Sequence, residues 1–239
     1  MAATVAATVA ATLAVAFGAW VVSVERMQGM DMGPGTSLGS FGFFAGTWAV
    51  MMAAMMLPSA VPAVVSFGRL TTSLPSAVGR WVRFVAGYLA IWELVGIVSF
   101  AVYGQITPPG LGGFGWPGLG SVLAGSAVVV AGIYQLTPLK RGCLERCREQ
   151  SGRRPPGAVT AGSRYGVDCL GSSAGPMVVL FALGAMSVTW MVVATVLVFA
   201  ERVPRVGSSL VVPIAVVLIG LGLWVALDPS AVPGLVAPM

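Results

Sequence analysis

Long apolar stretches alternate along the chain with short polar or glycine-rich segments. A bilayer core needs about 20 apolar residues for each helix that crosses it, so stretches of this length predict transmembrane helices. Six such spans are predicted, at residues 3–24, 42–67, 84–105, 121–137, 177–200 and 210–227. The pattern therefore predicts an all-α fold, a polytopic transmembrane helical bundle of about six spans in which residues 1–239 form one integral membrane domain.

The apolar region at residues 165–200 is too long for one upright helix. Gly171, Gly175 and Pro176 are expected to divide it. Non-helical backbone within a membrane is tolerated where it is buried in protein. This division predicts a short re-entrant or interfacial helix before the fifth span. If the first piece crossed the membrane completely, the chain would have seven spans, and this alternative stays open.

Basic residues set the predicted orientation, because Lys and Arg in short loops stay on the cytoplasmic side. Ten of the thirteen lie within residues 69–83 and 138–164. We therefore expect a multi-pass protein of the cell (plasma or inner) membrane, with both loops and both termini in the cytoplasm and residues 201–209 outside. In the seven-span alternative, Arg202 and Arg205 would move inside.

Composition supports a membrane protein and narrows its chemistry. Apolar residues make up 57% of the chain and charged residues 9%, whereas a soluble domain has roughly 25% charged residues. The net charge of +5 comes from basic residues beside the spans, where they meet lipid headgroups, so a lipid bilayer and not nucleic acid is the expected partner. Histidine is absent, which removes the commonest metal ligand and the usual axial ligand of haem. No nucleotide motif or catalytic constellation is present, so we expect no haem, no nucleotide and no enzyme.

A methionine-rich loop follows the first span. Met27, Met30 and Met32 place three thioethers beside Asp31 within six residues. Thioethers are soft, uncharged ligands that suit Cu(I) and need no deprotonation, so the loop is a candidate copper-capture site outside the membrane. Packing of these methionines against lipid or helix ends is the alternative.

The second span carries two methionine pairs at helical i, i+4 spacing. These are Met51 with Met55 and Met52 with Met56. Side chains at this spacing lie on one side of a helix, so a soft cation could pass along them. Methionine as ordinary apolar filler is the alternative. Pro58 and Pro62 are expected to kink or shorten this helix, and Pro58 leaves the carbonyl of Ala54 as a further candidate ligand.

Three cysteines lie near the longest basic loop. Cys143 and Cys147 have i, i+4 spacing, and Cys169 follows the basic stretch. The neighbouring Lys and Arg residues favour thiolates, which bind Cu(I) or Zn(II), so the three could form one trigonal metal site. Three unrelated reduced thiols are the alternative.

Glu93 is the acidic residue that lies well inside a predicted span. A carboxylate in a membrane interior is by default a candidate functional group. It could carry protons, bind a hard metal ion, or pair with Arg83 or Gln135. A structural hydrogen bond between helices is the alternative.

Taken together, these motifs resemble a bacterial family of predicted metal-binding integral membrane proteins. The resemblance rests on Gly29-Met30-Asp31-Met32-Gly33 and on the segments 48–58, 134–147, 165–171 and 183–191. It covers most of residues 27–201 and implies metal binding and a membrane location. Members tend to carry further cysteines after Cys169-Leu170-Gly171, where this chain has Ser172 and Ser173. Hydroxyls are weak ligands for soft ions, so the departure leaves at most three cysteines for a metal site.

The sequence thus favours a membrane protein that captures Cu(I) through the methionine loop and passes it along the second span toward the thiols. Two other hypotheses stay open. One is a structural or assembly subunit that packs as a homo-oligomer or with a larger membrane complex, as the many small residues suggest. The other is a proton-coupled transporter that uses Glu93.

Overall fold

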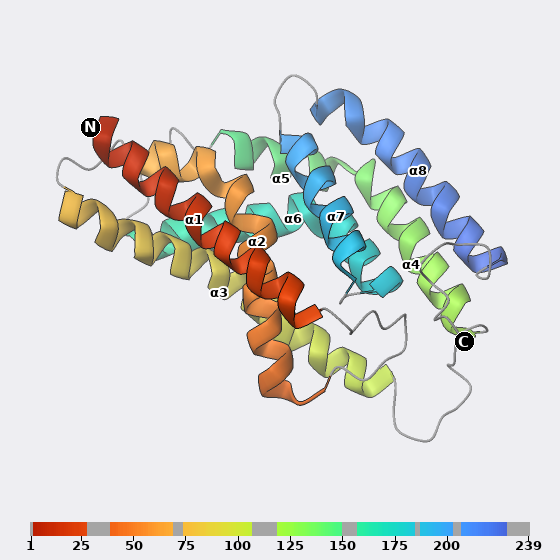
Figure 1. Ribbon diagram of the computed structural model, residues 1–239. Coiled ribbons are helices and arrows are strands. Elements are labelled where there is room, and N and C mark those ends of the chain that lie inside the picture. Colours follow the sequence, from red (N-terminus) through yellow and green to blue (C-terminus); the bar gives the residue numbers. More distant parts are fainter. Residues whose placement is uncertain are drawn as a thin grey trace. The chain divides into compact units, whose positions relative to one another are not determined.

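The computed structural model describes residues 2–27, 39–68, 74–106, 119–149, 157–184, 187–202 and 207–228, and these ranges contain helices and no strand (Figure 1). The helices are α1 (Ala2–Met27), α2 (Phe41–Gly68), α3 (Leu74–Ile106), α4 (Leu119–Gln135), α5 (Pro138–Arg148), α6 (Ala158–Gly184), α7 (Val188–Arg202) and α8 (Gly207–Leu227). The predicted all-α fold is confirmed.

Five of these helices, α1, α2, α3, α6 and α8, are long and apolar enough to cross a membrane. A sixth crossing results if α4 and α5, which meet at 64°, are counted together. The apolar part of that pair is α4. Helix α5 has only 11 residues and is rich in Lys and Arg, so we treat it as lying outside the apolar segments.

Two helices extend into regions that the sequence predicted to be loops. Helix α3 begins at Leu74, so Arg80 and Arg83 lie on it and not in a connecting loop. Helix α5 occupies part of the predicted basic loop and has Arg146 and Arg148 in its last turn, where positive charge favourably meets the helix dipole. Long apolar stretches predict membrane spans, whereas short polar helices such as α5 have no such stretch and were not predicted.

The predicted break before the fifth span is wrong. Helix α6 continues through Gly171, Gly175 and Pro176, and its boundary comes after Gly184. The two glycines serve close packing: a Cβ at Gly171 would overlap Cys143 Sγ, and one at Gly175 would lie 3.3 Å from the Gln135 side chain. Helix α2 likewise continues through both of its prolines to Gly68.

The chain forms two compact units, which are described separately. Unit 1 comprises residues 1–25, 40–98 and 142–172, and unit 2 comprises residues 26–39, 99–141 and 173–239. Helices α5 and α6 each contribute residues to both units. The single membrane domain stays a prediction from the sequence.

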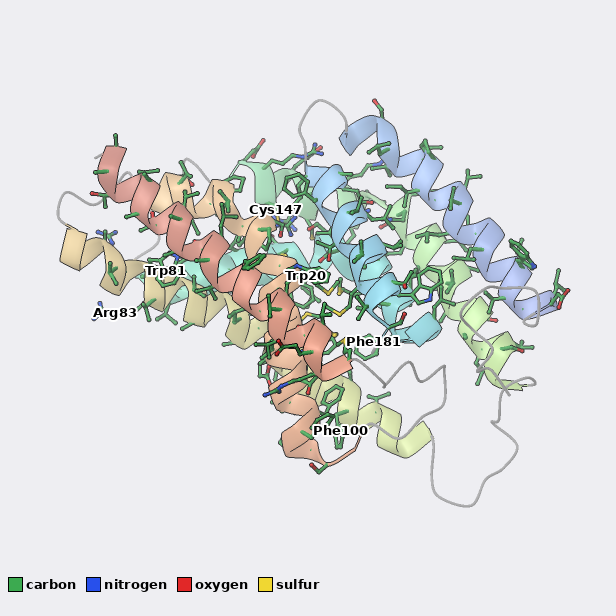
Figure 2. All side chains as sticks on the ribbon, viewed as in Figure 1. Trp20, Trp81, Arg83, Phe100, Cys147 and Phe181 are labelled. Carbon is green, nitrogen blue, oxygen red and sulfur yellow. The ribbon has the colours of Figure 1, made fainter. Side chains whose placement is uncertain are left out.

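In unit 1, helix α2 has the most buried surface. The stretch from Met51 to Leu57 is buried at every position. Helix α1 is buried along a threonine stripe that includes Thr8 and Thr12, and the Trp81 indole of α3 donates to the Thr12 hydroxyl at 2.8 Å (Figure 2 labels Trp81). Most other side chains of α1 are exposed or half-buried, which fits a helix with lipid around it.

In unit 2, helices α4 and α8 pack closely and run antiparallel. Gly125 meets the backbone of Gly222, and Gly132 meets Ala215 and Ile219. Small residues let two helix backbones approach in this way. The aliphatic core beside them contains Val128, Ala131, Val179, Leu183, Ile214, Leu218 and Val225.

The antiparallel pair corrects the predicted path of the chain. With one span between them, spans 121–137 and 210–227 would run parallel. Besides the short polar α5, the structure has two apolar helices between α4 and α8, because α6 ends at Gly184 and α7 begins at Val188. A salt bridge of 2.6 Å from Lys140 Nζ to Glu201 Oε1 also places the segment that follows α4 and the last turn of α7 at the same end of unit 2.

Candidate metal-binding site

The four methionines of α2 are all enclosed within the protein. The exposed fractions of Met51, Met52, Met55 and Met56 are 2%, 1%, 1% and 0%. A face of α2 turned to lipid would leave some of these side chains exposed. Their thioethers are therefore directed toward neighbouring helices or along α2 itself.

Aromatic residues of α3 pack against this part of α2. Trp48 Nε1 donates to the Trp92 carbonyl at 2.8 Å, and Tyr88 Oη donates to the Met56 carbonyl at 3.3 Å. These two bonds show that α2 and α3 run antiparallel. The paired segments, 48–56 on α2 and 88–92 on α3, bracket Met52, so the methionine segment lies beside this part of α3.

Helix α6 brings a thiol to the same place. Cys169 Sγ lies 3.1 Å from the Tyr88 hydroxyl and is fully buried. One turn earlier, Tyr165 Oη donates to the Ser59 carbonyl of α2 at 3.1 Å. The Tyr88 hydroxyl thus lies between the Met56 carbonyl and the Cys169 sulfur, and α2, α3 and α6 meet around it. We call Met51, Met52, Met55, Met56 and Cys169 the sulfur core.

The other two cysteines lie on α5 and pack against α6 at Gly171 and Ser172. Cys143 contacts Gly171, and Cys147 Sγ lies 3.8 Å from Ser172 Oγ (Figure 2 labels Cys147). Both are buried, although less completely than Cys169. The three cysteines predicted as one trigonal site are thus divided between two places. Within the described residues, no three His, Cys, Asp or Glu side chains are grouped closely enough to hold a metal ion.

Arg146 holds the Cys143 side chain in place. Its Nη2 donates to Cys143 Sγ at 3.1 Å, and its Nε donates to Asp168 Oδ1 at 2.7 Å. The hydrogen bond to Asp168 raises the pKa of Arg146, with the charge of Cys143 acting in the same direction. The guanidinium therefore stays positive beside the sulfur.

The predicted capture loop lies almost entirely outside the described residues. This applies to Met30, Asp31 and Met32. Met27 is the last residue of α1 and is buried, with 1% of its surface exposed. Metal binding by these residues stays a prediction.

Glu93 lies on α3 and is half-buried. Arg83 is ten residues away on the same helix, a separation of about 15 Å along the axis, so the two cannot pair. Gln135 donates instead to Glu201. Neither predicted partner of Glu93 is therefore its partner in the structure, and its role as a proton carrier stays a prediction.

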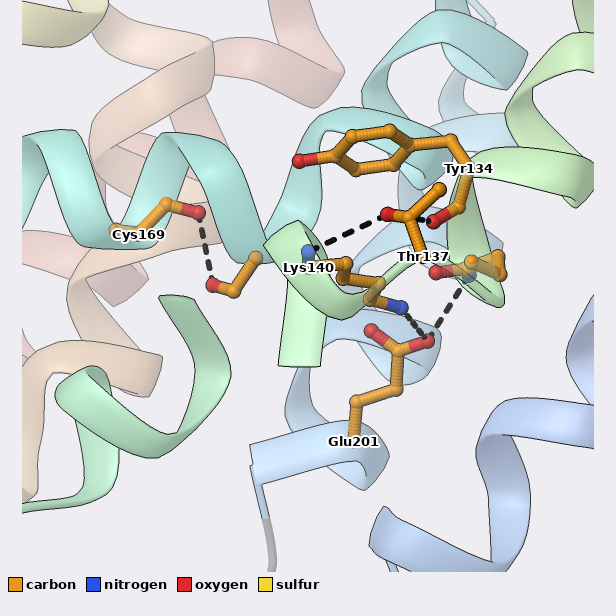
Figure 3. Close-up of polar contacts among 7 residues, drawn as sticks. Tyr134, Thr137, Lys140, Cys169 and Glu201 are labelled. Carbon is orange, nitrogen blue, oxygen red and sulfur yellow. Dashed lines mark hydrogen bonds and ion pairs between the residues drawn. The ribbon is translucent and has the colours of Figure 1, made fainter. Parts of the chain in front are cut away.

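A buried charge pair in unit 2 was missed from the sequence. Lys140 and Glu201 have side-chain exposures of 0% and 2%, and Glu201 Oε1 also accepts from Gln135 Nε2 at 3.0 Å (Figure 3). The sequence assigned both charged residues to loops. Their short helices, α5 and the end of α7, are polar enough at these positions to hide the helical pattern.

A copper-related role for the chain follows from its comparison with known protein families. A helical protein with a buried set of soft sulfur ligands and no histidine is suited to handling a soft metal ion. Residues 45–225 match the model of a family described as PpoB2, copper chaperone. The chain therefore belongs to the PpoB2 copper chaperone family, which confirms the predicted copper-related role. No significant match is found among curated proteins or solved structures.

Proposed function

We propose that this protein is an integral membrane copper chaperone that holds Cu(I) in the sulfur core of unit 1. The observation that supports the proposal most strongly is the complete burial of Met51, Met52, Met55 and Met56 beside a helix that also presents Cys169. Thioethers and a thiolate match the preference of Cu(I) for soft ligands.

The charge of the site also suits a buried monovalent cation. Thioethers are neutral, so the four methionines could stabilise Cu(I) without bringing an unpaired negative charge into an apolar interior. Cys169 can balance the ion with a single negative charge once its thiol proton is lost. Trp48 lies one turn before Met51 and Met52 on α2, and an indole ring adjacent to a cation attracts it through its π face.

The path of the chain forms a further part of the proposal. Helix α8 runs antiparallel to α4. The Lys140–Glu201 bond joins α5, which follows α4, to the last turn of α7. With the basic loop in the cytoplasm, α7 crosses back toward it, as in the seven-span alternative, and Asp228 lies on the outer side. Arg202 then joins the other basic residues at the cytoplasmic end, in agreement with the positive-inside rule.

The copper proposal is tested by replacing all four core methionines with leucine in the full-length protein. Leucine conserves the volume of methionine, so the fold should tolerate the change. Purified protein in detergent is titrated anaerobically with Cu(I) against a chromogenic Cu(I) chelator, and tryptophan emission is recorded. We expect the quadruple variant to bind one copper ion fewer than the unchanged protein and to lose the emission change that accompanies binding near Trp48.

The matched control replaces Met177 and Met191 with leucine. Both are buried methionines, with 5% and 0% of their surface exposed, but they lie in unit 2. This variant should bind copper as the unchanged protein does. If the quadruple variant kept the full copper stoichiometry and the emission change, the sulfur core would not be the copper site.

A further inference from the structure

We propose that Cys143 and Cys147 form a second Cu(I) site, a dithiolate site at the edge of unit 1 from which copper leaves for an acceptor. This inference rests on the proposed copper function and adds an exit site to it. The structure separates these two thiols from Cys169, so they need not share one metal ion with it.

The two thiols converge on one turn of α6. On α5 they have i, i+4 spacing, which puts their Cβ atoms roughly 5–6 Å apart on one face of the helix. Cys143 contacts Gly171 and Cys147 Sγ lies 3.8 Å from Ser172 Oγ, so both sulfurs are directed at adjacent residues of α6. Two sulfurs held in this way can bind Cu(I) with low coordination number.

The charges around the pair fit a dithiolate complex. Binding is a ligand exchange in which two thiols release two protons to solvent and the copper stays Cu(I), so no oxidant or reductant is needed. The resulting complex carries one negative charge. Arg146, whose Nη2 lies 3.1 Å from Cys143 Sγ, supplies the opposite charge, and Asp168 fixes its position through the bond at 2.7 Å.

The two sites differ in the exposed surface of their cysteines. Cys169 has no exposed surface, whereas Cys143 and Cys147 have 6% and 8%, and Arg146 beside them is exposed. Ser172 lies beside the second site, since its hydroxyl approaches Cys147 Sγ, and it also donates to the backbone carbonyl of Cys169 one turn earlier at 2.9 Å (Figure 3 shows the Cys169 bond). An acceptor with thiolate ligands can therefore reach the pair on α5 more readily than it can reach the core.

The test is a Cu(I) titration of the full-length protein in which Cys143 and Cys147 are both replaced by serine. The unchanged protein should bind two copper ions, this variant one, and the quadruple methionine variant one. Because the serine variant keeps the sulfur core, its tryptophan emission should still change with copper. If it instead bound two copper ions, the second site would be refuted while the sulfur core remained.

The role of the Arg146 charge is tested by two further variants. Arg146→Gln should weaken binding at the second site about tenfold, because a charge-assisted hydrogen bond to the thiolate is lost. Arg141→Gln, an exposed arginine on the same helix, is the matched control and should leave both affinities unchanged. Equal affinities in Arg146→Gln and Arg141→Gln would contradict the charge argument.

Ser172→Cys is a variant that should gain binding strength. It places a third thiol near Cys147, where the hydroxyl now lies at 3.8 Å. Copper at the second site should then become three-coordinate in X-ray absorption and bind more tightly. No change in coordination or affinity would show that copper is not held beside Ser172, and would overturn the proposed placement of the site.

Discussion

The interiors of the two units are built from different side chains. The core of unit 1 around α2 contains four neighbouring thioethers, a thiol and the hydroxyls of tyrosines, whereas the cluster around α4 and α8 in unit 2 is aliphatic, and unit 2 also contains the buried Lys140–Glu201 pair. Hydropathy does not identify the sulfur-rich helix, since α8 is more apolar than α2. Of these two helices, the less apolar one carries the candidate metal ligands.

The largest expected effect concerns the side of the membrane on which the end of α8 lies. Alkaline phosphatase fused after Asp228 should be active, because the enzyme works outside the cytoplasm, and the same enzyme inserted after Glu149 should be inactive. The antiparallel α4–α8 pair is the physical reason for opposite outcomes. Equal activity at both positions would show that α8 does not cross as we propose.

Breaking the buried charge pair should have the next largest effect. Lys140→Met leaves the Glu201 carboxylate buried without its ammonium partner, which we expect to cost about 3–5 kcal/mol. Thermal unfolding in detergent measures the loss. The double variant Lys140→Met, Glu201→Gln removes both charges and should recover most of the stability. Copper binding by folded protein should be unchanged in both, since the sulfur core lies in unit 1.

The smallest effect separates the two buried tyrosines of unit 1. Tyr88→Phe and Tyr165→Phe each remove one hydroxyl that donates to a carbonyl of α2, at a cost of about 1 kcal/mol each. Tyr88 also approaches a thiol, since its hydroxyl lies 3.1 Å from Cys169 Sγ. Tyr88→Phe should therefore alter the rate at which Cys169 reacts with a maleimide in denaturant-free detergent, and Tyr165→Phe should leave that rate unchanged. Identical rates in the two variants would contradict a specific Tyr88–Cys169 contact.

Sequence pattern alone predicted most apolar helices, because a continuous apolar run such as residues 3–24 indicates a single helix, but the predicted fifth span at residues 177–200 is divided between α6 and α7. It failed where a residue type has two uses. Gly171 and Gly175 resemble helix breaks, yet in α6 they allow neighbouring side chains to approach. Polar helices such as α5 gave no apolar signal.

The sequence named the candidate ligands, whose metal binding stays a prediction, but it did not predict how the structure groups them. Spacing showed that the methionines of α2 share a side, and the structure adds that this side is buried. Which cysteine accompanies them depends on where α6 lies beside α2 and α3, a contact between segments more than 80 residues apart. For the same reason Tyr88 could not be found from the chain.

The position of the Tyr88 hydroxyl has a consequence for the loaded state. Tyrosine has one O–H proton, and here it has two neighbours that can receive it, the Met56 carbonyl and the Cys169 sulfur. A neutral thiol satisfies all three groups by pointing its own S–H at the tyrosine oxygen. If Cys169 binds Cu(I) as proposed, its thiolate has lost that hydrogen and only accepts, so the Tyr88 hydroxyl would turn its proton from the Met56 carbonyl to the Cys169 sulfur. The rotation of this hydroxyl would thereby couple metal binding at Cys169 to the backbone of α2, which carries the methionines.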